Sequence, residues 1–174
     1  MNVLTPPKTM LEVFKLLPEG TLCQLINNQL IMSPAPSDPH QYITGEIFAE
    51  IRSILKKNKF GEVRIAPYDV YINNKNVYQP DIVFIAKENV HKIKKNGLHG
   101  APDLVVEVLS PDTSKYDLTE KKKIYERFGV KEYWAVEPET KKVTFFKLVE
   151  EKFVEMDSER GTINSELLKA SFSF

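Results

Sequence analysis

The spacing of apolar side chains along the chain predicts helices that alternate with short strands. Apolar residues that recur every third or fourth position indicate a helix, whereas alternation or a short apolar run indicates a strand. Helices are predicted over residues 8–17, 37–58 and 117–128. Strands are predicted over residues 61–66, 68–72, 80–85, 103–110 and 132–138, with residues 73–76 as the turn between the second and third of them. Two hairpins are predicted, one around Asn27-Asn28 and one around Glu150-Glu151, and the tail over residues 163–174 is expected to pack.

This order of elements favours an α/β fold. Strands and helices that follow one another along the chain form a mixed sheet flanked by helices. The first helix and hairpin precede that sheet in the sequence. At 174 residues, the chain fits one domain that spans residues 1–174.

The composition narrows the class of protein. The 24 basic and 24 acidic side chains give a formal net charge of zero, which argues against a protein held on nucleic acid by bulk charge alone. Lysines cluster in residues 56–59, 91–95 and 120–123, a pattern typical of a solvated surface. No apolar run is long enough to cross a membrane, and the N-terminal residues 1–20 lack the pattern of a secretory signal. With Cys23 as the single cysteine, we expect a cytoplasmic protein without disulfides.

The strand over residues 103–110 carries an acid in the middle of an apolar run. Because strand side chains alternate, Leu104, Val106 and Val108 share one wholly apolar face, which belongs to the core. Glu107 lies on the other face with Asp103, about 13 Å away at roughly 3.3 Å per residue. This separation is too large for the two acids to share one metal ion. A buried carboxylate must be paired, hydrogen-bonded or metal-bound, so a partner for Glu107 is expected on another strand.

Asp81 is the best candidate for that partner. It follows Pro80 at the start of another apolar strand, and acids on neighbouring strands can lie within a few ångströms of each other. Two such carboxylates suit Mg²⁺ or Mn²⁺, which prefer hard oxygen ligands. From spacing alone, Asp81 can equally be a residue that bonds its own turn. Asp103 is favoured as a cap or turn residue.

The helix over residues 117–128 turns a lysine towards the body of the protein. At roughly 100° per residue, Leu118, Ile124, Tyr125 and Phe128 fall on one side, and Lys121 lies in the middle of that arc. An inward lysine needs an anionic partner, and Glu107 on the preceding strand is within reach. The alternative is a lysine whose stem covers apolar surface while its amine reaches water.

His40 falls on the apolar side of its helix, in the first turn. A packed histidine that bonds a neighbour is the favoured interpretation. A residue that lines a site is the alternative. With three histidines and one cysteine, the sequence does not support a zinc cluster.

Several segments resemble a known family. "QPDIVFI", "PDLVVEVLSP", the Asp117, Lys121 and Tyr125 series with a spacing of four, and "GVKEYWAVEP" are similar to the Uma-type putative restriction endonuclease family. That family belongs to the PD-(D/E)xK nuclease superfamily. The hairpin and His40 also resemble its N-terminal half, so that the resemblance runs from about residue 10 to the end.

The resemblance implies a restriction-endonuclease-like fold and cleavage of DNA by a Mg²⁺- or Mn²⁺-dependent endodeoxyribonuclease. Asp81 and Glu107 match the two acids of the motif and would be the metal ligands. Leu109 occupies the position of the motif lysine, whose role the resemblance transfers to Lys121 on the following helix. These three residues are the predicted catalytic residues, and Tyr125 is expected to support or pack against them.

The hairpin departs from the family pattern. Gln24 stands where a glutamate is common, and Asn28 stands where a glycine is common. Position 24 therefore lacks the negative charge that an accessory role in the family would use.

Two rival functions stay open. One is a catalytically silent nucleic-acid-binding member of the same fold. The other is a protein-interaction module in which Lys121 and Glu107 form only a buried ion pair. A homodimer fits a nuclease that cuts both strands.

Overall fold

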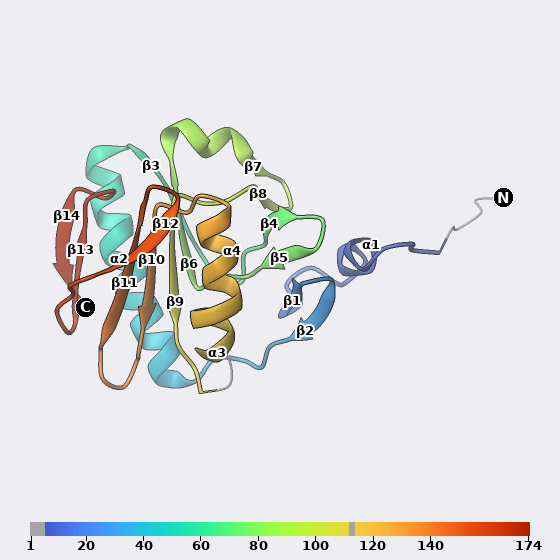
Figure 1. Cartoon of the computed structure of the whole chain (residues 1–174), viewed down its shortest axis with the longest axis horizontal. Helices are drawn as coiled ribbons and strands as arrows, with labels where there is room; N and C mark the ends of the chain where they lie inside the picture. The colour runs from blue at the N-terminus through green and yellow to red at the C-terminus, as the bar shows by residue number, and fades with distance from the viewer. Residues whose placement is uncertain (1–5, 112–113) are drawn as a thin grey trace.

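A six-stranded mixed sheet forms the centre of the computed structural model, which describes residues 6–111 and 114–174 (Figure 1). In spatial order its strands are β12 (Lys152–Met156), β11 (Val143–Val149), β10 (Glu132–Val136), β9 (Leu104–Val108), β6 (Ile82–Ala86) and β3 (Gly61–Ile65). β9 and β10 run parallel, and every other pair of neighbours in this sheet is antiparallel. Residues 1–5, part of the N-terminal stretch that lacks the pattern of a secretory signal, lie outside the described residues.

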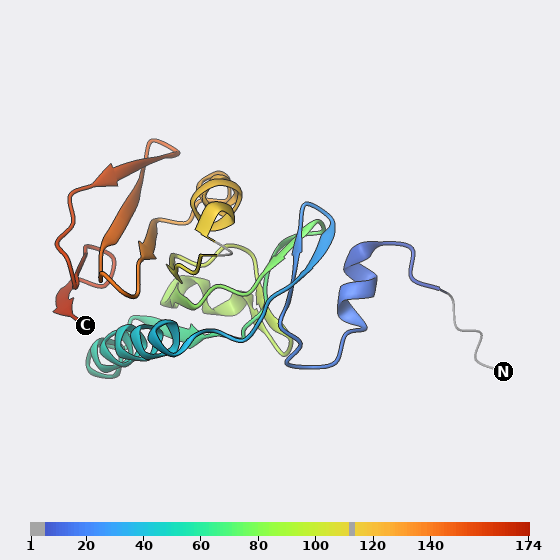
Figure 2. The same ribbon diagram turned by 90° about the horizontal axis from the view of Figure 1, so that it is seen from below.

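Helices cover both faces of this sheet, as the sequence predicts. α2 (Asp38–Asn58) lies on one face and α4 (Lys122–Arg127) on the other, with the sheet between them (Figure 2). α2 starts with Pro among its first residues, where the missing N–H costs no hydrogen bond. Among the described residues, no helix is both long and apolar enough to span a membrane.

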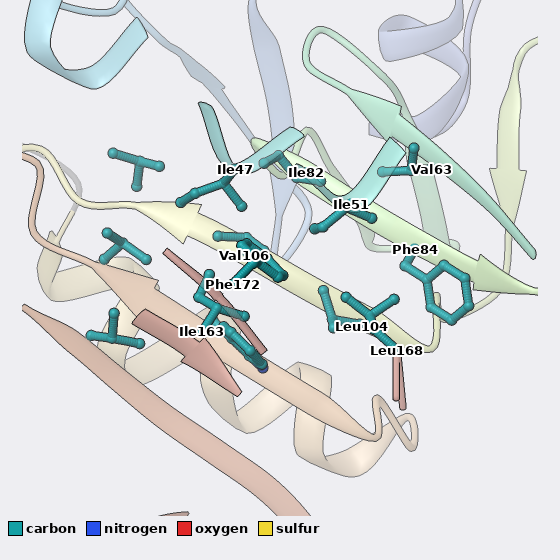
Figure 3. Packing of buried hydrophobic residues seen from close by; sticks show 14 of the residues in the cluster. Ile47, Ile51, Val63, Ile82, Phe84, Leu104, Val106, Ile163, Leu168 and Phe172 are labelled. Atoms are coloured by element: carbon teal, nitrogen blue, oxygen red, sulfur yellow. The ribbon is translucent and has the colours of Figure 1, made fainter. Parts of the chain in front are cut away.

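The core beneath α2 comes from the apolar positions that recur along that helix. Ile47 and Ile51 are almost fully buried and pack towards Val106 of β9 (Figure 3). Each such side chain contributes about 1.5–3 kcal/mol when it leaves water. This packing fixes the middle of α2 against the central strands.

The alternation predicted for β9 is confirmed. Leu104, Val106 and Val108 pack in the core beneath α2, whereas Val105 and Leu109 pack in the core on the opposite face of the sheet. Both faces of β9 are therefore covered.

A second six-stranded sheet was predicted only in part. Its order is β2 (Gln29–Met32), β1 (Cys23–Ile26), β5 (Asn76–Tyr78), β4 (Val70–Asn73), β8 (Gly97–His99) and β7 (Ile93–Lys94). The hairpin of β1 and β2 is confirmed, with positive φ at Asn27 and Asn28. β5, β7 and β8 were missed because two or three residues are too few to show a period. The predicted turn at 73–76 therefore leads into β5 rather than into the strand that contains Ile82.

The ends of the chain also pack. α1 (Met10–Lys15) buries Phe14 against the second sheet. The last residues form the hairpin of β13 (Thr162–Ser165) and β14 (Ala170–Ser173), which joins the core beneath α2. The hairpin predicted at Glu150-Glu151 is confirmed, and both residues have positive φ.

The helical segment after β9 is less regular than predicted. It consists of α3 (Ser114–Tyr116), a π-helical turn over Asp117–Lys121, and α4. Leu118 and Phe128 are each 37% exposed, so their predicted inward placement was wrong. A π-helical turn closes i to i+5 bonds and is wider than an α-helical turn. A projection at 100° per residue therefore misplaces side chains across it.

Candidate active site

The register of β6 and β9 brings the two predicted acids to the same end of the central sheet. The strands are antiparallel and Ile82 is paired with Val106. Continued by one residue, this register places Asp81 opposite Glu107. The prediction that these acids come from neighbouring strands is thereby confirmed.

Glu107 is buried in spite of its charge, and its carboxylate is held by two donors. The Lys121 amine donates to Oε1 at 3.0 Å, and the Tyr125 hydroxyl donates to the same oxygen at 2.8 Å. The pKa of Glu107 is raised to about 8, mainly by burial and also by the charges of Asp117 and Asp81, whereas Lys121 and the Tyr125 hydrogen bond act to lower it. The site therefore accommodates a proton, or another cation, on this carboxylate.

Lys121 points inward and bridges two carboxylates. Besides Glu107, its amine lies 2.8 Å from Oδ1 of Asp117, and all three side chains are buried. Burial lowers the pKa of Lys121, but Glu107 and Asp117 outweigh burial and raise it above its usual value. Lys121 is therefore a permanent cation at this position, and the alternative of a stem that only covers apolar surface is wrong.

Asp81 does not bond its own turn through its side chain. Its Oδ2 accepts a 2.7 Å hydrogen bond from the backbone N–H of Val108 and lies 3.3 Å from Nε2 of His40. Burial lowers the pKa of His40. The hydrogen bond and charge of Asp81, with smaller effects of Val108 and Glu107, outweigh burial and raise this pKa. His40 therefore lines the site, the less favoured of the two predicted interpretations.

These side chains line one cleft of about 380 Å³. Its walls come from the hairpin, the loop after it, the start of α2, the ends of β3 and β9, and the π-helical turn. The polar side chains that line it include those of Gln24, His40, Asp81, Glu107, Asp117 and Lys121. Segments up to 99 positions apart in the sequence thus meet at one surface, from Leu22 to Lys121.

Among the described residues, the charged groups of the cleft do not balance. Three carboxylates, of Asp81, Glu107 and Asp117, face the ammonium of Lys121. A proton on His40 offsets part of the excess negative charge. A bound divalent cation would offset it more fully.

The carboxylates of Asp81 and Glu107 fit a metal ion of this kind. Both contacts of Asp81 use Oδ2 and both hydrogen bonds of Glu107 use Oε1. Within residues 6–111 and 114–174, no donor reaches Oδ1 of Asp81 or Oε2 of Glu107, which leaves one oxygen on each for a cation. In the same residues no group of three or more His, Cys, Asp and Glu has the arrangement of a metal centre. The fit is thus to an ion that keeps several waters or phosphate oxygens, as Mg²⁺ does.

Asp117 is the site residue that sequence reasoning missed. Its signal was present, because Asp117, Lys121 and Tyr125 are spaced by four and share the buried side of the helical segment. Asp103 lies outside the cleft, where it accepts a hydrogen bond from the backbone of Ala86 and pairs with Lys131. That role is structural, but the contacts join separate segments of the chain rather than forming the predicted cap or turn of Asp103 itself.

Gln24 keeps a role in the cleft without a charge. Its Oε1 accepts a 3.2 Å hydrogen bond from the backbone N–H of Gln79, which joins the hairpin to the chain just before Asp81. Leu109 is buried in the core and takes no part in the cleft. The predicted shift of the lysine from position 109 to the helix agrees with this packing.

Comparison with known proteins identifies a family model and a fold. The model described as "Uma2: Putative restriction endonuclease" matches residues 11–173. A putative nuclease belonging to DUF820 from Anabaena variabilis ATCC 29413 is similar in structure, with a TM-score of 0.77 and 20% identity over 96% of this chain and 95% of that chain. This similarity shows the fold. The type IIG restriction endonuclease BpuSI aligns over 73% of this chain and 14% of its own, with 18% identity and a TM-score of 0.41. No curated protein matches the chain.

Proposed function

Because the chain belongs to the Uma2 family of putative restriction endonucleases, we propose that it is a divalent-metal-dependent endonuclease that hydrolyses phosphodiester bonds in DNA. The observation that carries this proposal is the meeting of Asp81, Glu107 and Lys121 in one cleft. Two carboxylates with one free oxygen each, beside a fixed lysine, suit phosphodiester hydrolysis.

Asp81 and Glu107 would hold Mg²⁺ or Mn²⁺ through their free oxygens. When bound, such a cation supplies Lewis-acid chemistry, which lowers the pKa of water and offsets negative charge on a phosphate. The protein contributes the orientation of the ligands. Val108 and His40 fix Asp81, and Tyr125 fixes Glu107.

Lys121 acts on the phosphate or on the attacking water. Its ammonium has three N–H donors, and the described contacts with Glu107 and Asp117 use two of them. No other acceptor among the described residues takes the third, which would donate to a phosphate oxygen or a water in the cleft. A preorganised donor that meets developing negative charge stabilises the transition state. Asp117 is a positioning residue, because it acts through the lysine amine.

Metal titration and DNA nicking test the proposal together. We expect Mn²⁺ to bind the wild type in isothermal titration calorimetry, with affinity lost in Glu107→Gln and in Asp81→Asn. Glu120→Gln is the matched control, since Glu120 pairs only with the exposed Lys123 among described residues. Wild-type protein should nick supercoiled plasmid in Mn²⁺, and both site variants should not. A wild type that binds no divalent ion and nicks no DNA would contradict the proposal.

A catalytically silent binding module is the second candidate. The observation in its favour is that Lys121 already bridges Glu107 and Asp117, so the buried charges have partners without a metal. In that case the wild type would bind DNA in EDTA as well as in Mn²⁺ and leave it uncut. Glu107→Gln would then change thermal stability and leave DNA affinity unaltered.

Domain number, assembly and compartment belong to the same proposal. We place one nuclease domain over residues 1–174, in the cytoplasm, as a homodimer that cuts both strands. Sedimentation equilibrium of the full chain tests the assembly. A monomer at concentrations that support double-strand cleavage would contradict the homodimer.

A further inference from the structure

A second cavity, of about 590 Å³, adjoins the candidate active site. Pro67 and Gln79 line both the cleft and this cavity, so that the two share a wall. The cavity lies between α1 with its following loop, the segment from Pro67 to Tyr71, and the turn that joins β7 to β8. The proposed metal ligands, Asp81 and Glu107, are not among the residues that line this cavity.

Backbone contacts fix one wall of this cavity. The backbone N–H of Leu98 donates to the carbonyl of Asp69 at 2.9 Å, which ties β8 to the segment before β4. Gly97 permits this approach, because its φ is +132° and an added Cβ would lie 2.2 Å from the Asp69 carbonyl oxygen. The wall that carries Asp69 is therefore fixed by backbone contacts.

The lining combines aromatic side chains with two carboxylates, of Asp69 and Glu19. Phe14, Tyr68 and Tyr71 supply aromatic rings, and Asp69 supplies hydrogen-bond acceptors. Asp69 accepts from Gln79 at Oδ1 (2.9 Å) and from the Tyr71 hydroxyl at Oδ2 (3.4 Å). Each carboxylate oxygen can accept a further hydrogen bond, so the cavity offers acceptors to a ligand with N–H groups.

Gln79 connects the cavity to the cleft through hydrogen bonds. Its side-chain amide donates to Asp69 and to the carbonyl of Thr21, and its backbone N–H donates to Gln24 in the cleft. Gln79 also lies only two residues before Asp81. Two residues of extended chain span at most about 7 Å, which is about two steps of a stacked DNA strand at roughly 3.4 Å each.

We propose that this second cavity receives one unpaired base of the DNA strand that is cut, one or two nucleotides from the scissile phosphate. Aromatic walls with hydrogen-bond acceptors are the means by which proteins hold a splayed base. Asp69 would select bases that present an amino group, such as cytosine, over thymine, which presents an oxygen at the same position. Lys15 and Lys95 are exposed lining residues that would meet the flanking phosphates.

This inference rests on the proposed function for its substrate but is tested without cleavage. The full chain is titrated, in EDTA, into fluorescein-labelled single-stranded 12-nucleotide oligomers, and fluorescence anisotropy gives the affinity. A single abasic site is placed at each position in turn. We expect one position, or two neighbouring ones, at which affinity falls about 5- to 150-fold, the effect of losing one stacked base.

Two variants tie the effect to the cavity. Tyr68→Ala should flatten the abasic profile, and thermal unfolding shows whether it is folded. Asp69→Asn keeps the size of the side chain and should abolish an expected preference of about five- to tenfold for cytosine over thymine at the sensitive position. Asp157→Asn, at an exposed aspartate outside this cavity, is the matched control and should retain the wild-type profile and preference.

The outcomes separate this inference from the proposed nuclease activity. A position-specific profile that depends on Tyr68 and Asp69, with no nicking in Mn²⁺, supports the base site and contradicts the nuclease. Nicking in Mn²⁺ with a flat abasic profile in the wild type overturns the base site and leaves the nuclease standing. Absence of any oligomer binding also overturns the base site, as does a profile that both folded variants retain.

Discussion

Removal of the Lys121 amine tests the charge arrangement of the cleft. In Lys121→Met, two carboxylates within 3.0 Å of that amine lose their counter-charge while a buried apolar stem remains. Breaking a buried ion pair by removal of one partner costs about 3–5 kcal/mol. For a chain of this size that corresponds to a fall in melting temperature of about 6–20 °C. The variant therefore loses a large part of a typical stability of about 5–15 kcal/mol.

The assay is urea unfolding followed by the fluorescence of Trp134, which is the single tryptophan and is buried. Lys123→Met is the matched control two positions away, because the Lys123 side chain is 73% exposed. We expect this control to lie within about 0.5 kcal/mol of the wild type. A loss of less than about 1 kcal/mol in Lys121→Met would refute the reasoning, since it would mean that the two carboxylates do not depend on the lysine.

The pH dependence of the same variant gives a second check. Without the lysine, the folded-state pKa of Glu107 rises further above its ordinary value of 4.5. A carboxyl group whose pKa is raised by folding stabilises the fold below its ordinary pKa, and this stabilisation is lost as pH rises through the folded-state pKa. The deficit of Lys121→Met relative to the wild type should therefore be smaller at about pH 5 than at about pH 8. A deficit independent of pH would contradict this assignment.

Three further predictions follow from described contacts. The pKa of Glu107, raised to about 8, predicts that the thermal stability of the metal-free wild type falls as pH rises from about 5 to 8. Over the same range, its affinity for Mn²⁺ in calorimetry should rise, because the carboxyl group loses its proton. A stability and an affinity that do not change with pH would contradict this prediction. Tyr125→Phe removes the 2.8 Å hydrogen bond to Glu107 and should cost about 1.5–3 kcal/mol in urea unfolding; no change would argue against that bond. Gly61→Ala places a Cβ 2.4 Å from the Ile85 carbonyl oxygen and the Phe84 ring, so a loss of about 1–3 kcal/mol is expected, and unaltered stability would show that β3 shifts freely.

The central sheet was predictable because its strands are long enough to show a period. β9 shows this most clearly, since its apolar face of Leu104, Val106 and Val108 and its second face with Glu107 could be read from alternation, and the apolar face is confirmed in the core beneath α2. The second sheet was not predictable to the same extent. Its strands β5, β7 and β8 span three, two and three residues. They are fixed by contacts distant in sequence, such as the pairing of Leu25 with Val77.

The candidate site shows the same division between local pattern and tertiary contact. An acid in an apolar strand and a lysine on an apolar helix face both conflict with burial, so Glu107 and Lys121 could be singled out from the sequence. Asp117 carried a signal of the same kind, because it lies four positions before Lys121, but its pairing with the Lys121 amine was not predicted, since it depends on the packing that buries both side chains. For a similar reason the sequence favoured a packed histidine at position 40 over a residue that lines the site, since the contact of His40 with Asp81 joins segments 41 residues apart.

A crystal structure of the wild type soaked in Mn²⁺ tests the central claim most directly. The account predicts an anomalous difference peak bound by Oδ1 of Asp81 and Oε2 of Glu107, the two oxygens that accept no hydrogen bond from the described residues, with the Lys121 amine beside the same cleft. The peak should be absent from Glu107→Gln crystals soaked in the same way. A wild-type cleft without a peak, or a peak that persists in Glu107→Gln, would contradict the account.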